Sequence, residues 1–160
     1  MENTGALEIA TPTEREVVLT RVFDAPRNLV FEALTKPDLL RRWYGLPGWS
    51  MVVCEVDFKV GGAFRFVSRR QDGKDVGQRG VYRKIVPPER IVNTEWWEDW
   101  NPGECLVTTV LTEQGGKTTF TSTTLYPSQD VRDTILNSGL KPGASSLFDK
   151  LAELLASIRQ

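Results

Sequence analysis

Residues 142–158, PGASSLFDKLAELLASI, carry the pattern that decides the fold. Apolar residues recur here at spacings of three and four, which is the period of one face of an α-helix. Polar and charged residues fill the positions between them. The apolar positions are Ala144, Leu147, Phe148, Leu151, Ala152, Leu154, Leu155 and Ile158. A helix this apolar on one side must pack against a large partner. The segment therefore predicts a long C-terminal amphipathic helix lying on a sheet.

The sheet is predicted from seven β-branched and aromatic segments, several of them joined by Gly-Gly or Pro-Pro turns. Short turns between consecutive strands favour antiparallel pairing. After the first strand, two short helical patterns follow Pro26, and Ser128 is a plausible N-cap for another short helix that ends near Gly139. The predicted strands are residues 16–24, 51–58, 63–70, 76–86, 90–97, 105–112 and 117–125.

This element order predicts an α+β fold, a curved antiparallel sheet of seven strands wrapped around the C-terminal helix, with two short helices after the first strand. Residues 1–14 are predicted to be a flexible tail and residues 15–160 a single domain. Because a twisted sheet and a straight helix match poorly over their full length, we expect a ligand-sized gap between them.

The composition narrows the possible functions. The 160 residues include no histidine, which removes Ser-His and Cys-His catalysis and most metal sites. The formal net charge is −1, which argues against nucleic acid or an anionic membrane surface as a partner. Two cysteines, Cys54 and Cys105, are too few for a disulfide framework. We therefore expect a cytoplasmic protein with no metal ion and no cofactor.

Four segments resemble the family of proteins similar to the activator of the heat-shock protein 90 ATPase. The resemblance covers residues 15–156 in the family's order. It implies the helix-grip fold of the START-like (SRPBCC) superfamily. Members of that superfamily include lipid carriers, hormone binders and cyclases. The family resemblance also allows a role in regulating a chaperone ATPase. The segments are VFDAPRNLVFEALTKPDLLRRWYGLPGW (22–49), CEVDFKVGGAFRF (54–66), GVYRKIVPPERIVNTEWW (80–97) and LYPSQDVRDTILNSGLKPGASSLFDKLAELL (125–155).

A carboxylate is predicted to point into the gap. Ile91, Glu95 and Trp97 share a parity in one predicted strand, so if Ile91 is in the core the other two face inward. A buried carboxylate needs a partner or a proton. Arg83, on the preceding strand, is a possible partner if Val81, Arg83 and Ile85 face inward. The alternative is an ion pair at the rim or a solvent-facing strand end.

Aromatic residues offer two further interpretations. Trp43 either covers a ligand at the cavity mouth or pins the short helices to the sheet edge. Trp96 and Trp100 lie in the segment EWWEDW (95–100) and are candidates for a surface that contacts a partner protein. Catalysis is the less favoured reading, because nothing in the spacing brings two carboxylates together and neither cysteine has a histidine to activate it.

The leading hypothesis is a non-catalytic protein that binds a small, largely apolar molecule between sheet and helix, as a monomer or homodimer. The first alternative is regulation of a chaperone ATPase by protein contact, and the second is a cyclase-like or hydrolytic enzyme that uses a cavity carboxylate. The predicted cavity residues are Trp43, Phe64, Phe66, Arg83, Glu95, Trp97, Phe120, Phe148 and Leu151.

Overall fold

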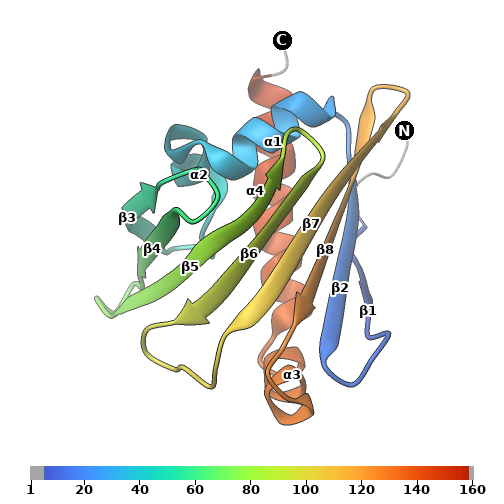
Figure 1. The fold of residues 1–160 in the computed structure, drawn as a ribbon. Helices are drawn as coiled ribbons and strands as arrows, with labels where there is room; N and C mark the ends of the chain where they lie inside the picture. The colour runs from blue at the N-terminus through green and yellow to red at the C-terminus, as the bar shows by residue number, and fades with distance from the viewer. Residues whose placement is uncertain (1–5, 159–160) are drawn as a thin grey trace.

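The computed structural model describes residues 6–158, and its central element is one antiparallel sheet in the order β1-β2-β8-β7-β6-β5-β4-β3. The sheet curves around helix α4, as Figure 1 shows. The strands are β1 (Glu8–Ala10), β2 (Glu16–Phe23), β3 (Ser50–Val56), β4 (Ala63–Arg69), β5 (Asp75–Val86), β6 (Arg90–Trp97), β7 (Cys105–Gln114) and β8 (Lys117–Leu125).

Two short helices, α1 (Arg27–Thr35) and α2 (Pro37–Trp43), connect β2 to β3 at one end of the sheet. A third, α3 (Gln129–Leu136), lies at the opposite end in Figure 1. Its N-cap is Ser128, whose side chain accepts a hydrogen bond from the Val131 backbone nitrogen at 3.2 Å. Gly139, at φ 85°, separates α3 from α4 as the sequence predicts.

Helix α4 (Leu140–Ile158) lies across the concave face of the sheet (Figure 1). Leu151 is 0% exposed and Leu155 is 2% exposed, because the apolar stripe of α4 is covered by the sheet. The Phe148 ring lies 5.0 Å from Phe120 of β8 and 6.2 Å from Phe23 of β2, centroid to centroid. The predicted α+β fold, with a curved antiparallel sheet around a long C-terminal helix, is confirmed.

The sheet has one strand more than the sequence analysis predicts. β1 lies inside residues 1–14, the segment expected to be a tail, and pairs antiparallel with β2 through Ile9 opposite Leu19. Leu7 is buried in the core next to it. Residues 6–10 are therefore part of the fold, whereas residues 1–5 lie outside the described residues. A three-residue strand carries too little periodicity to be recognised without its partner.

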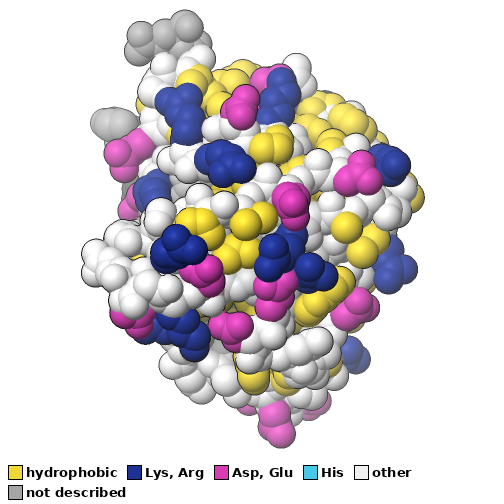
Figure 2. All heavy atoms as spheres, turned by 90° about the vertical axis from the view of Figure 1, so that its left-hand side faces the viewer, with side chains coloured by type: hydrophobic (Ala, Val, Ile, Leu, Met, Phe, Trp, Pro, Cys, Tyr) yellow, Lys and Arg dark blue, Asp and Glu magenta, His cyan; other side chains and the backbone are white. Residues whose placement is uncertain are grey.

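The surface shown in Figure 2 mixes charges of both signs with small groups of hydrophobic side chains. This face is the left-hand side of Figure 1, near β3 and β4. A mixed surface of this kind generates no strong field of one sign. Within residues 6–158, no helix is both long enough and apolar enough to cross a membrane.

Candidate functional site

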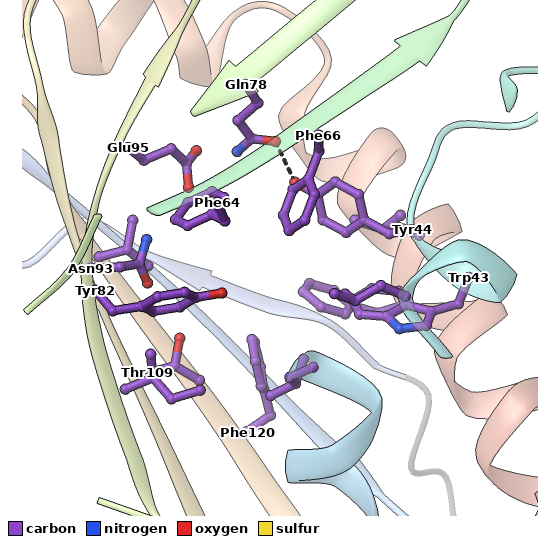
Figure 3. Close-up of a pocket in the computed structure, with 16 residues that line it drawn as sticks. Trp43, Tyr44, Phe64, Phe66, Gln78, Tyr82, Asn93, Glu95, Thr109 and Phe120 are labelled. Atoms are coloured by element: carbon purple, nitrogen blue, oxygen red, sulfur yellow. Dashed lines mark hydrogen bonds between the residues drawn. The ribbon is translucent and has the colours of Figure 1, made fainter. Parts of the chain in front are cut away.

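A cavity of about 160 Å³ lies between the inner face of the sheet, helix α2 and helix α4. Its wall is mostly aromatic and aliphatic and includes a few polar side chains. Figure 3 shows the cavity from close up. The cavity is smaller than the several hundred Å³ typical of ligand sites. It is lined by Leu34, Leu40, Trp43, Tyr44, Phe64, Phe66, Gln78, Tyr82, Ile91, Asn93, Glu95, Val107, Thr109, Phe120, Leu147 and Phe148.

A row of aromatic rings from three elements forms one wall. Phe64 and Phe66 alternate on β4, so both face inward, with ring centroids 5.0 Å apart. Tyr82 of β5 lies 5.4 Å from Phe64, and Tyr44, which follows α2, lies 5.2 Å from Phe66. The Phe64 ring covers Gly80 on β5, where a Cβ would collide with the ring and with a backbone carbonyl. Gly80 therefore permits this position of the Phe64 ring.

Trp43 fixes the α2 side of the cavity. Its indole nitrogen donates a hydrogen bond to the Ala33 carbonyl oxygen at 2.8 Å, and the residue is only 3% exposed. Its ring is stacked on Phe148 of α4 at 6.3 Å. Trp43 thus joins α1, α2 and α4 while one part of its ring lines the cavity. This packing agrees with the interpretation that Trp43 fixes the short helices in place. That its ring covers a ligand stays a prediction.

Glu95 is the acidic residue of the cavity. Ile91, Asn93 and Glu95 alternate on β6 without interruption, and all three line the wall. Burial raises the pKa of the Glu95 carboxyl from 4.5 to about 7, while a hydrogen bond from Gln78 acts in the opposite direction. The cavity thus holds a carboxyl group that exchanges its proton near neutral pH.

Gln78 connects Glu95 to the helical side of the cavity. The Tyr44 hydroxyl donates to the Gln78 side-chain oxygen at 2.6 Å, and the Gln78 amide nitrogen faces Glu95 (Figure 3). Burial, followed by the negative charge of Glu95, raises the pKa of Tyr44 well above its usual value, so the hydroxyl keeps its proton. The hydrogen bonds therefore run in one direction, because the Tyr44 hydroxyl donates to Gln78 and the Gln78 amide donates to the Glu95 carboxylate.

Three further polar side chains of the wall have oxygen atoms without a hydrogen bond from another described residue. They are the Tyr82 hydroxyl, which points into the cavity in Figure 3, the Thr109 hydroxyl and the Asn93 side-chain oxygen. The Asn93 amide nitrogen donates to the Thr94 carbonyl oxygen at 3.0 Å, which leaves its oxygen as an acceptor. Within residues 6–158, no cluster of carboxylates and thiols has a metal-binding arrangement.

Six of the predicted cavity residues line the cavity: Trp43, Phe64, Phe66, Glu95, Phe120 and Phe148. Leu151 is fully buried in the core beneath it. Trp97 faces the same side of the sheet as Glu95 but packs beyond the cavity, in a second core cluster with Val17, Cys105 and Tyr126. That these residues bind a ligand stays a prediction.

The predicted inward position of Arg83 is wrong, because Arg83 is exposed and lines no part of the cavity. β5 has an irregular register between Tyr82 and Lys84, where Tyr82 pairs with Asn93 and Lys84 with Val92. An extra residue in one strand reverses the side to which later residues point. Ile85 consequently packs on the core as predicted, while Tyr82 takes the inward position on the other side of the bulge.

Trp96 and Trp100 lie away from the cavity. Trp96 is half-buried and pairs with Arg79 of β5. Trp100 is 41% exposed, and its ring is stacked on Trp97 at 5.8 Å with an interplanar angle of 26°. Part of its apolar area therefore faces solvent, as a contact residue for a partner protein would require.

The sequence analysis missed Gln78 and Tyr82, although Gln78, Gly80 and Tyr82 alternate on one strand. The available signal was Gly80 between two larger residues, which is typical of a close approach by another side chain. Strand parity between Arg83 and Ile85 points to Arg83 instead, because the bulge beside Arg83 leaves no local pattern. Asn93 shares the parity of Ile91 and Glu95 and also lines the wall.

The chain is similar in sequence and in fold to known proteins. The sequence profile of the family described as Activator of Hsp90 ATPase homolog 1-like protein matches residues 24–156. A crystal structure of a protein from Rhodobacter sphaeroides is 27% identical, with a TM-score of 0.91 and coverage of 95% of this chain and 99% of that one. No curated protein is significantly similar in sequence.

Two further solved structures have the same fold. A protein from Chromobacterium violaceum is 26% identical, with a TM-score of 0.78 and coverage of 88% of this chain and 97% of that one. A protein from Nitrosomonas europaea is 24% identical, with a TM-score of 0.82 and coverage of 92% and 97%.

Proposed function

This chain belongs to the family of Activator of Hsp90 ATPase homolog 1-like proteins, and we propose that it binds a small, largely apolar molecule in the cavity between its sheet and α4 without transforming it. The helix-grip fold of its START-like (SRPBCC) superfamily is compatible both with ligand binding and with a co-chaperone role. The cavity geometry favours the first of these.

The aromatic cavity is the observation that carries this proposal. Its volume, about 160 Å³, is close to that of an apolar cavity of about 150 Å³ that accommodates benzene. The ligand that fits is therefore the size of one aromatic ring. The wall is mostly apolar, with polar side chains at Glu95, Gln78, Asn93, Tyr82 and Thr109, so a ligand with one polar end has a defined orientation.

The expected affinity follows from the ligand's size. A ring that buries about 150–200 Å² gains roughly 4–5 kcal/mol at about 25 cal/mol per Å². A gain of about 4 kcal/mol corresponds to a Kd of about 1 mM, and this is the tight limit because association costs reduce the gain. Simple apolar probes should therefore bind in the millimolar range, and a natural ligand must add polar contacts.

Two measurements test the proposal. Native mass spectrometry of the protein purified from its own host should show a retained small molecule, and titration calorimetry with toluene and benzyl alcohol should show saturable binding. Thr109→Phe fills the cavity and should abolish binding. Thr108→Phe makes the same change on the other face of β7 and should leave binding intact.

Absence of a retained molecule together with no binding of either probe would contradict the proposal. Equal binding by both variants would show that the probes bind elsewhere. Thermal unfolding of each variant verifies folding, and a ligand that binds the native state should raise the midpoint of the unmodified protein.

Regulation of a chaperone ATPase is a second candidate, favoured by the family name and by the exposed ring of Trp100. In this case the protein should change the ATPase rate of a heat-shock protein 90 homologue. Trp100→Ala should weaken that effect, whereas Thr109→Phe should not. No change in the ATPase rate at saturating protein would exclude this role.

Catalysis by a cavity carboxyl is the third candidate. A carboxyl with a pKa of about 7 is suited to general acid–base chemistry at neutral pH. An enzyme should lose turnover on Glu95→Gln while it stays folded. A ligand recovered unchanged after long incubation with the protein would favour binding over catalysis.

A further inference from the structure

Among residues 6–158, the cavity wall contains a carboxylate and no basic side chain. Glu95 lines the wall, and none of the other lining residues is a lysine or arginine. Two basic side chains outside the wall have partners of their own. Lys150 of α4 donates to the Gly45 carbonyl oxygen at 3.0 Å, and Arg79 donates to Glu98 at 2.6 Å on the exterior.

The titratable groups around Glu95 are neutral. Tyr44 after α2, Cys105 on β7 and Tyr126 after β8 each have a pKa raised by burial and by the charge of Glu95. Tyr82 on β5 has a pKa raised by burial and by Cys54. α4 contributes only Leu147 and Phe148 to the wall. An ionised Glu95 thus has Gln78 as a hydrogen-bond donor but no counter-ion among the described side chains that line the wall.

The remaining polar groups present acceptor atoms. The Asn93 side-chain oxygen and the hydroxyls of Tyr82 and Thr109 receive no hydrogen bond from a described residue. The rings of Phe64 and Tyr82 lie beside these groups (Figure 3). Ring faces attract cations, most strongly where water is excluded. A carboxylate, several acceptors and aromatic faces together are complementary to a positively charged hydrogen-bond donor.

We propose that the ligand is a primary amine in its protonated form, attached to a body of about one aromatic ring, and that Glu95 is its counter-ion. This inference rests on the proposed function, because it needs the cavity to be a ligand site. The ring of the ligand occupies the aromatic part of the cavity. The ammonium group donates to the Glu95 carboxylate.

The charge state of Glu95 makes binding depend on pH. The empty site exchanges its proton at a pKa of about 7, because burial disfavours the charge. An alkylamine, like a lysine with a pKa of about 10.4, is protonated throughout the range from pH 6 to pH 8. Amine binding requires the carboxylate, so its affinity increases as the pH rises through 7.

The test compares three probes of equal size: benzylamine, benzyl alcohol and toluene. Calorimetry at pH 6 and pH 8 should show benzylamine bound at least tenfold more tightly than benzyl alcohol at pH 8. The Kd of benzylamine should weaken about tenfold at pH 6, in proportion to the ionised fraction of a group with a pKa of about 7. The Kd of toluene should change little.

Glu95→Gln keeps the shape and removes the charge, so it should abolish both the preference for benzylamine and the pH dependence. Glu104→Gln, an exposed site outside the cavity, is the matched control and should leave both unchanged. The comparisons on the unmodified chain remain decisive even if the Glu95 variant fails to fold.

Three negative results are distinguishable. Binding of toluene and benzyl alcohol as tight as that of benzylamine at pH 8 would overturn the amine inference and leave the proposed function standing. No binding of any probe would contradict the proposed function itself. A benzylamine preference that persists in Glu95→Gln would assign the selectivity to another group and overturn the role of Glu95.

Discussion

Replacement of Glu95 by glutamine should stabilise the empty protein, and the stabilisation should grow with pH. Burial favours the protonated carboxyl, so the pKa is higher in the folded protein, about 7, than in the unfolded chain, at 4.5. The folded state then binds more protons than the unfolded state between these values. Stability therefore falls as the pH rises from 4.5 to 7, and it stays lower above pH 7.

The size of the effect follows from the shift. Each pKa unit corresponds to about 1.36 kcal/mol, so the ionised Glu95 costs the folded protein roughly 3 kcal/mol above pH 7. Between pH 5 and pH 8 the difference in unfolding free energy between Glu95→Gln and the unmodified protein should increase by about 2–3 kcal/mol. For a chain of this length, that is a change of about 5–10 °C in Tm.

The assay is urea and thermal unfolding of both proteins at several pH values from 5 to 8. Other groups titrate equally in both, so the difference between the two profiles isolates Glu95. Glu104→Gln, which is exposed, should give a profile parallel to that of the unmodified protein. A parallel profile for Glu95→Gln as well would refute the claim that the cavity holds a carboxyl without a counter-charge.

Three further substitutions test the packing. Ser128→Ala removes the oxygen that accepts from the Val131 backbone nitrogen, and should lower the unfolding free energy by about 1 kcal/mol in urea. Leu151→Ala leaves a void at a position with 0% exposure, and should cost about 2–5 kcal/mol while far-UV circular dichroism keeps its native shape. Gly80→Ala places a methyl group against the Phe64 ring, should cost about 1–3 kcal/mol, and should alter the near-UV spectrum. An unchanged unfolding midpoint in any of these would contradict the contact concerned.

The position of Glu95 shows how far strand parity can be trusted. The alternation of Ile91, Asn93 and Glu95 runs along β6 without a bulge, so one core residue sets the direction of the others. The same argument fails on β5, where the irregular register beside Arg83 separates Ile85 from Tyr82. Nothing in the local sequence marks that bulge, because the pairing with β6 defines it.

The family resemblance and the periodicity of α4 agreed on the fold, and the structure confirms it. The size of the cavity was not predictable from either. It depends on how the rings of Trp43, Phe64 and Phe148 fill the space between elements that are distant in the sequence. Replacing any one of these rings by a smaller side chain would change the volume of the cavity without changing any helix or strand.

The amino-acid sequence by itself determined the order of the elements from residue 16 onward, the apolar stripe of α4 and the shared face of Ile91 and Glu95, because each depends on residues within a few positions of one another. Only the tertiary structure decided that Gln78 donates to that carboxyl, that Tyr82 and not Arg83 lines the cavity, and that Leu7 joins the core. These outcomes depend on strand pairing and side-chain packing across the whole chain, where distant partners set the geometry.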